Sequence, residues 1–390
     1  MLPETLDGTY ERTLQEIKQA NRESAQRLLF CVAAASRPLR VEELAEIIAF
    51  DFNSGTIPKF HKDWRLKNPV EAVLSACSTL LSIVNVNTDG GTSRVVRFAH
   101  FTVKEFLMSR RFAERRDNIS RRYYISMSRA HTSVAQACLG MLLHFDKNIT
   151  SWSLQQFPFA EYAAEHWFEH ARSEGVSQHV MEGMKQLFDR MKPHLSIWLW
   201  ILDPTVPYWR RRERAEVAPP PCGTPLHYAA FCGLQDIAEI LAIQHPQDVN
   251  SQRVDDGSSP LHLASQAGHV DIAQMLIDRG AEVSAQTKNG STALHLASEN
   301  GHVDLARMLI ERGADVSAQK TNGWTALHWV SQNGHVDLAQ MLIERGANVA
   351  AQTEDGSTAL HLASLNGHLD LAQLLVDVGG VIATLAITFG

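Results

Sequence analysis

Three residues near the middle of the chain have the spacing of a zinc-binding motif: His166, Glu169 and His170 read H-x-x-E-H. On a helix, histidines four positions apart face the same side, as two ligands of one Zn²⁺ ion must. Such a site also needs a carboxylate ligand from a second helix, and the sequence offers no evident candidate. The surrounding AEYAAEHWFEHAR is strongly apolar on one face. We therefore interpret the motif as a structural part of this helix and not as a metal site.

Histidine also recurs at a fixed period in the C-terminal part of the chain. His262, His295, His328 and His361 follow one another at intervals of 33 residues, and His227 precedes them by 35 because IQHPQD carries a small insertion. A second series follows glycine at His269, His302, His335 and His368. Repeated helices stack about 10 Å apart, whereas each nitrogen of a zinc site lies about 2 Å from the metal. We therefore expect neutral imidazoles that bond the backbone and a capping hydroxyl, and neither a metal nor another cofactor.

Arginine clusters are the residues that could contact phosphate. Six arginines lie in RRFAERRDNISRR (residues 110–122), where Glu114 and Asp117 interrupt them, and more lie in WRRRER (residues 209–214). Residues 223–376, in contrast, carry 7 Lys and Arg against 17 Asp and Glu, a net charge of −10 with neutral His, which repels phosphate backbones. We therefore do not expect the repeats to bind nucleic acid. Nucleic-acid binding through a winged helix in the N-terminal part stays an alternative function. The chain shows neither a serine-nucleophile elbow nor a cysteine paired with histidine, so we expect no enzyme activity.

The recurring histidines belong to a repeat with the parts of a helix pair. In NGSTALHLASENGHVDLARMLIERG (residues 289–313), Asn-Gly predicts a tight turn and Thr292 is placed to cap the short helix ALHLASEN. A glycine then breaks the chain, and VDLARMLIER predicts a second helix with Leu305, Leu309 and Ile310 on one face. Two short helices bury little apolar surface alone. Neighbouring copies must therefore cover one another in a solenoid.

This pattern resembles the ankyrin repeat, whose signature is G-x-T-P-L-H-x-A-A-x-x-G-H, over five copies in residues 223–376. The resemblance implies a protein ligand bound on the concave face, through the hairpin tips and the exposed face of each first helix. The candidate contacts are residues at these positions: Lys288, Asn289, Ser291, Glu299, Asn300, Asn322, Trp324, Trp329, Gln332, Asn333, Asp355 and Leu365. Trp324 stands where other copies have Ser, and Trp329 where others have Leu, and an exposed indole is a common interface anchor. The alternative is that Trp329 packs between helices while Trp324 covers its hairpin.

The sequence before the repeats predicts two further domains. Residues 1–112 contain four helical segments, then a hairpin from LLSIVNV to RVVRFAHF, then the helix TVKEFLMSRRF, which indicates a winged-helix domain. Residues 113–205 predict a helical domain, and the proline-rich residues 206–222 predict a linker. Residues 377–390 form an atypical apolar tail in place of a polar capping repeat. The predicted fold is mainly α: a winged helix with one β-hairpin, a helical domain and an ankyrin solenoid.

Phrases of the N-terminal half resemble a second group of proteins. LPETLDGTYERTL, RPLRVEELAEIIA, VRFAHFTVKEFLMS and FAEYAAEHWFEHAR are similar to the segment between the NTPase and the repeats of fungal NACHT–ankyrin proteins, STAND ATPases related to NOD-like receptors. The chain has no G-x-x-x-x-G-K-[S/T] motif that would hold nucleotide phosphates. The resemblance implies a fragment or an NTPase-less form of such a signalling receptor. An ATPase subunit completed by another chain is the enzymatic alternative.

The sequence also indicates where the protein acts. Its apolar runs are shorter than the roughly 18–20 residues that cross a membrane, and its N-terminus lacks the order of a signal peptide. Five scattered cysteines fit neither a disulfide framework nor a metal site. We therefore expect a cytoplasmic, non-catalytic protein that binds another protein and does not contact a membrane.

Overall fold

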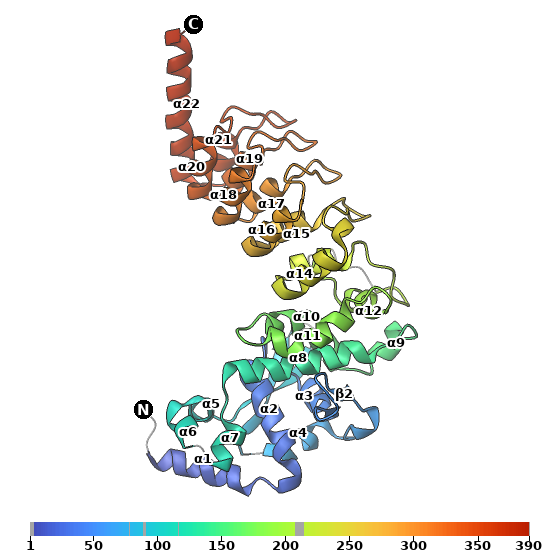
Figure 1. Cartoon of the computed structure of the whole chain (residues 1–390). Coiled ribbons are helices and arrows are strands. Elements are labelled where there is room, and N and C mark those ends of the chain that lie inside the picture. Colours follow the sequence, from blue (N-terminus) through green and yellow to red (C-terminus); the bar gives the residue numbers. More distant parts are fainter. Residues whose placement is uncertain (1–3, 78, 89–90, 116, 207–213, 390) are drawn as a thin grey trace. The chain divides into compact units, whose positions relative to one another are not determined.

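The computed structural model describes residues 4–77, 79–88, 91–115, 117–206 and 214–389. The chain divides into two compact units, Met1–Pro221 and Cys222–Gly390. Both are built mainly from helices (Figure 1). The predicted mainly α fold is confirmed.

The first part of the N-terminal unit combines short helices with a two-stranded wing. Its elements are α1 (Glu4–Glu16), η1 (Gln19–Asn21), α2 (Arg22–Ala34), α3 (Val41–Ile47), β1 (Phe50–Asp51), β2 (Lys59–Phe60), η2 (Lys62–Trp64), α4 (Pro69–Cys77), β3 (Leu81–Thr88), β4 (Gly91–Phe98), α5 (Phe101–Met108), α6 (Arg110–Glu114) and α7 (Asn118–Tyr123). Strands β3 and β4 pair antiparallel from Leu81 opposite Phe98 to Thr88 opposite Gly91. The hairpin predicted for the wing is therefore present.

A second, smaller hairpin was not predicted. Strands β1 and β2 pair antiparallel, with Phe50 opposite Phe60. Their rings lie 5.1 Å apart, and the ring of Phe50 also lies 6.4 Å from that of Phe159 in a later helix. Each strand has two residues, too few for an alternating pattern to be recognised. Aromatic contacts with a residue distant in sequence therefore stabilise a hairpin that the local sequence does not predict.

The rest of this unit is a helical layer around two tryptophans. Its helices are α8 (Met127–His144), α9 (Ser151–Leu154), α10 (Phe159–Ala171), α11 (Ser177–Leu187) and α12 (His194–Ile201). Trp167 and Trp198 are fully buried with ring centroids 5.2 Å apart, and the indole N–H of Trp198 donates to the carbonyl of Ala164 at 2.9 Å. The buried indole thus keeps a partner for its N–H, as a buried tryptophan usually does.

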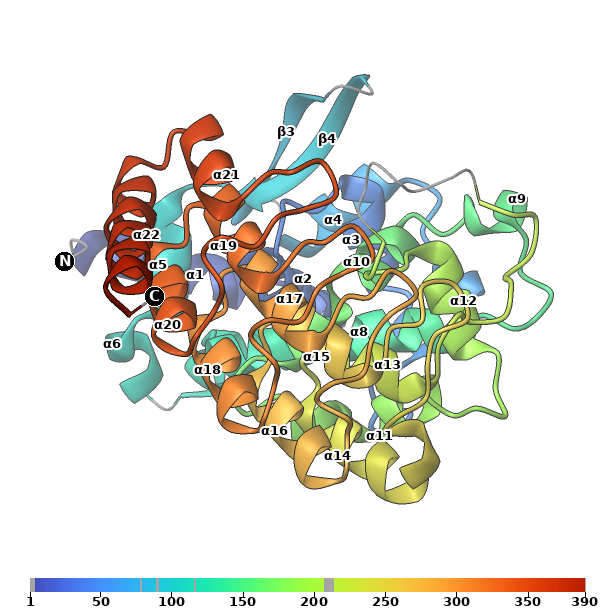
Figure 2. The ribbon, with the colours of Figure 1, turned by 90° about the horizontal axis from the view of Figure 1, so that it is seen from above.

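The C-terminal unit is a row of five helix pairs among the described residues. The first helices of the pairs are α13 (Pro225–Phe231), α15 (Pro260–Ala267), α17 (Ala293–Glu299), α19 (Ala326–Asn333) and α21 (Ala359–Leu365). The second helices are α14 (Gln235–Gln244), α16 (Val270–Asp278), α18 (Val303–Glu311), α20 (Val336–Glu344) and α22 (Leu369–Phe389), with the short η4 (Pro246–Asp248) after α14. Figure 2 shows the two kinds of helix as parallel rows within this unit, with the hairpin loops beside the first helices.

The apolar face of the second helices joins neighbouring pairs. Leu305 and Leu309 are fully buried, and each contributes roughly 1.5–3 kcal/mol through the apolar surface that it removes from water. Ile310, predicted on the same face, is only half-buried. Within α18, the packed face is therefore formed by Leu305 and Leu309, while the first helices of neighbouring pairs also pack against one another.

The last helix differs from its predecessors in length. The equivalent helices α16, α18 and α20 have 9 residues, whereas α22 continues for 21 residues through the apolar tail. Leu369, its first residue, and Leu365, the last residue of α21, are largely exposed. Among the described residues, no helix has the length and apolar character needed to cross a membrane.

Candidate interaction surface of the repeats

The first histidine series fastens each repeat to the next one. Nδ1 of His295 accepts from the backbone N–H of Thr292 at 3.2 Å and lies 2.8 Å from the hydroxyl of that threonine. On the other side of the ring, Nε2 donates to the carbonyl of Trp324 in the following repeat at 3.2 Å. Burial lowers the pKa of His295 to about 4, so the ring is neutral at pH 7. The predicted contacts of the imidazole with the backbone and the capping hydroxyl are confirmed.

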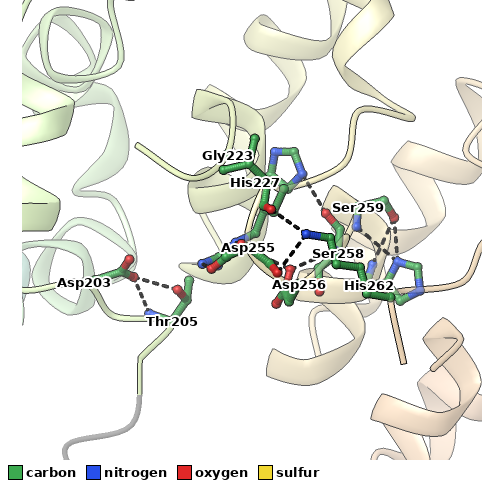
Figure 3. Close-up of polar contacts among 12 residues, drawn as sticks. Asp203, Thr205, Gly223, His227, Asp255, Asp256, Ser258, Ser259 and His262 are labelled. Atoms are coloured by element: carbon green, nitrogen blue, oxygen red, sulfur yellow. Dashed lines mark hydrogen bonds and ion pairs between the residues drawn. The ribbon is translucent and has the colours of Figure 1, made fainter. Parts of the chain in front are cut away.

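The same arrangement recurs at the start of the array (Figure 3). His227 donates from Nε2 to the carbonyl of Ser258 at 3.0 Å, and His262 donates to the carbonyl of Ser291 at 3.0 Å. Burial lowers the pKa of His227 to about 4 and also lowers the pKa of His262. The sequence did not predict that these rings reach the following repeat.

The second histidine series fastens repeats in the opposite direction. Nε2 of His302 donates to the carbonyl of Gln266 in the preceding repeat at 3.2 Å, and His368 donates to the carbonyl of Gln332 at 3.0 Å. Gly301 has a φ of +72°, and a Cβ built on it would lie 2.6 Å from the ring of His335. A larger residue would therefore collide with the histidine of the next repeat.

The hairpin tips are held together by backbone hydrogen bonds. The N–H of Lys288 donates to the carbonyl of Asp256 at 2.9 Å, and the N–H of Thr321 donates to that of Asn289 at 3.1 Å. The N–H of Glu354 donates to the carbonyl of Asn322 at 3.0 Å. Because the backbones bond one another, the side chains that point away from the tips are left for other contacts.

The candidate contacts predicted from the sequence fall into three classes of exposure. Seven are exposed: Lys288, Asn289, Asn300, Asn322, Asn333, Asp355 and Leu365. Four are half-buried: Glu299, Trp324, Trp329 and Gln332. One, Ser291, is buried. Ser291 is only 4% exposed, because its N–H bonds the hydroxyl of Thr287 at 3.0 Å and its carbonyl accepts from His262. Its selection as a surface residue was wrong, and it is left out of the surface considered below.

Two half-buried tryptophans lie against each other in the fourth repeat. The ring centroids of Trp324 and Trp329 are 4.6 Å apart with an interplanar angle of 49°. The ammonium group of Lys320 lies 4.8 Å from the centroid of Trp329, a cation–π contact. Hairpin and helix thus share one aromatic cluster, formed by Trp324, Trp329 and Lys320. The sequence did not predict Lys320 as a member, although it precedes Trp324 in the same hairpin.

Lys320 of this cluster and Glu299, whose charge acts on it, are both partly removed from water. Burial raises the pKa of Glu299, an effect that the charge of Lys320 opposes. Burial likewise lowers the pKa of Lys320, and the charge of Glu299 opposes that shift. Among the described residues, Nε1 of Trp329 and Oε1 of Gln332 are buried without a hydrogen-bond partner. An unpaired buried polar atom costs roughly 1–3 kcal/mol, so a hydrogen bond supplied to either atom would be stabilising.

The H-x-x-E-H motif does not assemble as a metal site. Nδ1 of His170 lies 2.8 Å from Nδ1 of His131, and its Nε2 lies 2.9 Å from the hydroxyl of Tyr162, whereas His166 bonds the carboxylate of Glu169 at 3.0 Å. Within the part of the chain that the structure describes, no group of three His, Cys, Asp or Glu residues is placed to hold a metal ion. The interpretation as a structural part of the helix agrees with the full burial of Trp167.

The arginine run divides into two parts. Arg110 pairs with Glu114 at 2.7 Å, and Arg111 and Arg115 pair with carboxylates of α1. Arg121 and Arg122, in contrast, line a cleft with other residues of the N-terminal unit. Arg116 and most of WRRRER lie outside the described residues; Arg214, the last residue of that stretch, pairs with Glu161 at 2.9 Å. The described arginines therefore do not form one continuous basic surface.

Comparison with known families finds two matches. Residues 226–320 and 315–384 match the family described as ankyrin repeats (3 copies). Residues 10–117 match the family described as GPI inositol-deacylase, winged helix domain. The predicted ankyrin and winged-helix regions are confirmed, while the NACHT–ankyrin resemblance stays a prediction.

Comparison with curated proteins finds two relatives. The chain is 30% identical over 300 residues to azaphilone pigments biosynthesis cluster protein L of Monascus ruber, an alignment that covers 72% of this chain and 60% of the relative. It is 40% identical over 62 residues to alpha-latrocrustotoxin-Lt1a of Latrodectus tredecimguttatus, covering 16% of this chain and 4% of the toxin. The chain thus spans less than two thirds of the length of the first relative and a small part of the second. What is established is a region of winged-helix type followed by ankyrin repeats.

Proposed function

We propose that the repeat array binds a protein ligand on its concave face, the face made by the hairpin tips and the first helices, with the aromatic cluster at its centre. The observation that carries the proposal is the contact between the half-buried rings of Trp324 and Trp329. Tryptophan is enriched among the few residues that dominate binding energy in protein interfaces. The exposed polar residues around the cluster would form the rim of the contact.

The charge of the array suggests the chemistry of this ligand. Residues 223–376 carry a net charge of −10, and Glu354 and Asp355 are exposed on one hairpin, whereas the exposed Asp255 and Asp256 pair with Arg253. The ammonium group of Lys288 donates to the carbonyls of Val254 and Asp255, at 2.6 and 3.1 Å, so part of its charge is already engaged within the array. We therefore expect a basic contact surface on the ligand and binding that weakens with salt.

Quantitative capture of partners by the whole chain tests this function. The wild type is compared with Trp324→Ala and with the control Arg307→Ala, which removes an exposed side chain from the second helix α18. A specific partner should be recovered equally by the wild type and the control, and at least about tenfold less by Trp324→Ala. Equal recovery by all three proteins would remove the aromatic cluster from the interface.

We propose further that the chain derives from a signalling receptor of the NACHT–ankyrin type. The order of a winged-helix region before ankyrin repeats supports this assignment, together with the N-terminal phrases that resemble such proteins. In such a receptor the array would capture the ligand and a separate NTPase module would respond to it. Sequencing the gene on both sides of this region tests the assignment. A phosphate-binding G-x-x-x-x-G-K-[S/T] motif upstream would support it, and an unrelated upstream domain would contradict it.

A further inference from the structure

The N-terminal unit contains a basic cleft that the proposed function does not use. The cleft has a volume of about 600 Å³ and is lined by residues of α1, α2 and α7. These three helices lie together in Figure 1. Among its described lining residues are Arg22, Arg121 and Arg122, together with Gln26 and Tyr123, and none is a carboxylate. The cleft is within the size range of small-molecule sites in proteins.

The three arginines of the cleft differ from those earlier in the arginine run. Arg110, Arg111 and Arg115 are each paired with a carboxylate. Within the described part of the chain, by contrast, no carboxylate lies at ion-pair distance from the guanidinium groups of three residues, Arg22, Arg121 and Arg122. Positive charge therefore collects at the cleft without an internal counter-ion.

Local hydrogen bonds fix the helices that carry these charges. Nε of Arg22 donates to the carbonyl of Ile17 at 3.2 Å, which orients the side chain at the start of α2. The amide of Gln26 donates to the carbonyl of Arg122 at 2.5 Å, which ties α7 to α2. The cationic groups thus stand on helices that are bonded to each other, as a preformed site requires.

Tyr123 supplies a second, independent observation. Its side chain is 2% exposed, and its hydroxyl has no hydrogen-bond partner among the described residues. Burial raises the pKa of Tyr123, while the charges of Arg122 and Arg22 act in the opposite direction, so both cations lie close enough to act on the hydroxyl. A buried O–H without an acceptor is uncommon in folded proteins. An anion in the cleft would supply that acceptor.

We propose that this cleft binds the phosphoryl group of a small phosphorylated ligand. Guanidinium groups match phosphate oxygens in geometry and charge, and the hydroxyl of Tyr123 adds a neutral donor. Leu14 and Ile119 line the same cleft and offer apolar contacts to the remainder of the ligand. A compact ligand fits better than a nucleic acid, because ion pairs engage Arg110, Arg111 and Arg115 of the same arginine run and interrupt any longer basic track.

Isothermal titration of the whole chain with inorganic pyrophosphate tests the proposal. We expect saturable binding of one pyrophosphate per chain at low ionic strength. Arg22→Gln combined with Arg122→Gln should weaken it about tenfold or more, since two charge-assisted contacts are lost. The control Arg110→Gln, which removes a cation already paired with Glu114, should change the affinity by less than about twofold. Absence of saturable heat, or equal affinity in the double variant, would overturn the proposal.

Tyr123→Phe gives a test that separates folding from binding. Because the hydroxyl has no partner in the free protein, its removal should leave thermal unfolding unchanged or slightly raise the midpoint, and should still weaken pyrophosphate binding about threefold or more. A destabilised free protein with wild-type affinity would show that the hydroxyl has a structural role instead. Titration with duplex DNA tests the alternative ligand. If DNA binds more tightly than pyrophosphate, and if Arg110→Gln weakens the binding of DNA, the assignment to a small ligand is overturned.

Discussion

Acidification should weaken the repeat array through its buried histidines, and His295 allows the effect to be calculated. Its pKa falls from 6.5 to about 4 in the folded protein because the ring is buried. Since the folded state binds fewer protons than the unfolded state between these values, stability is fully present above pH 6.5 and is lost as the pH falls toward 4. At about 1.36 kcal/mol for each pKa unit, the loss at pH 4.5 is about 2.5 kcal/mol for this one residue.

The substitution His295→Gln isolates this contribution. It should destabilise the array at pH 7, because the bonds to Thr292 and to the carbonyl of Trp324 are changed. It should also reduce the loss of stability between pH 7 and pH 4.5 by about 2.5 kcal/mol, since the titrating group is gone. His361→Gln is the matched control: His361 holds the equivalent position but is exposed, and the described residues give it no bond to a later repeat.

Hydrogen exchange read by mass spectrometry measures this effect within the whole chain. The opening free energy of peptides that cover α17 is determined at pH 7 and pH 4.5 after correction for the intrinsic exchange rate at each pH. The account predicts a smaller difference between the two pH values for His295→Gln than for the wild type. An identical difference in both proteins would refute the argument, because it would mean that the buried ring does not govern the acid sensitivity of the repeat.

Two further substitutions test the packing of the repeats. Gly301→Ala should destabilise the array by about 2 kcal/mol or more, because the new Cβ would clash with His335. The control Gly313→Ala, also at positive φ but in open space, should cost only about 1–2 kcal/mol. Equal costs for the two substitutions in thermal or denaturant unfolding would contradict the predicted clash. Arg253→Ala should cost about 1–2 kcal/mol, because the buried Arg253 side chain loses its packing while its partner Asp255 stays exposed to water; exchange in the first two repeats that stays at the wild-type level would contradict this estimate.

Local sequence was sufficient for the repeats because their signals are local. Turn glycines, capping hydroxyls and leucines at helical spacing act within one copy. Because the pattern occurs five times, its period is easily recognised. The buried position of Ser291 was missed because it depends on contacts between copies: His262 of the preceding repeat bonds its carbonyl. The register between neighbouring hairpins cannot be predicted from the sequence of one copy.

The N-terminal unit shows the limits of local sequence more clearly. The β1–β2 hairpin depends on Phe50 contacting Phe159, more than a hundred positions later. The run of arginines looked like one basic segment, yet Arg111 is paired with Asp7 of α1, whereas Arg122 lines the cleft. These differences depend on which distant carboxylate reaches each guanidinium group. Only tertiary structure supplies that information.

The central claim is that the concave face of the repeats is the surface that binds protein. The most direct measurement is a map of amide hydrogen exchange across the whole chain, with and without a saturating partner obtained by the capture experiment. The account predicts slower exchange in the hairpins and first helices around Trp324 and Trp329, with the second helices α18 and α20 unchanged. Protection confined to the second helices, or to the N-terminal unit, would contradict the account.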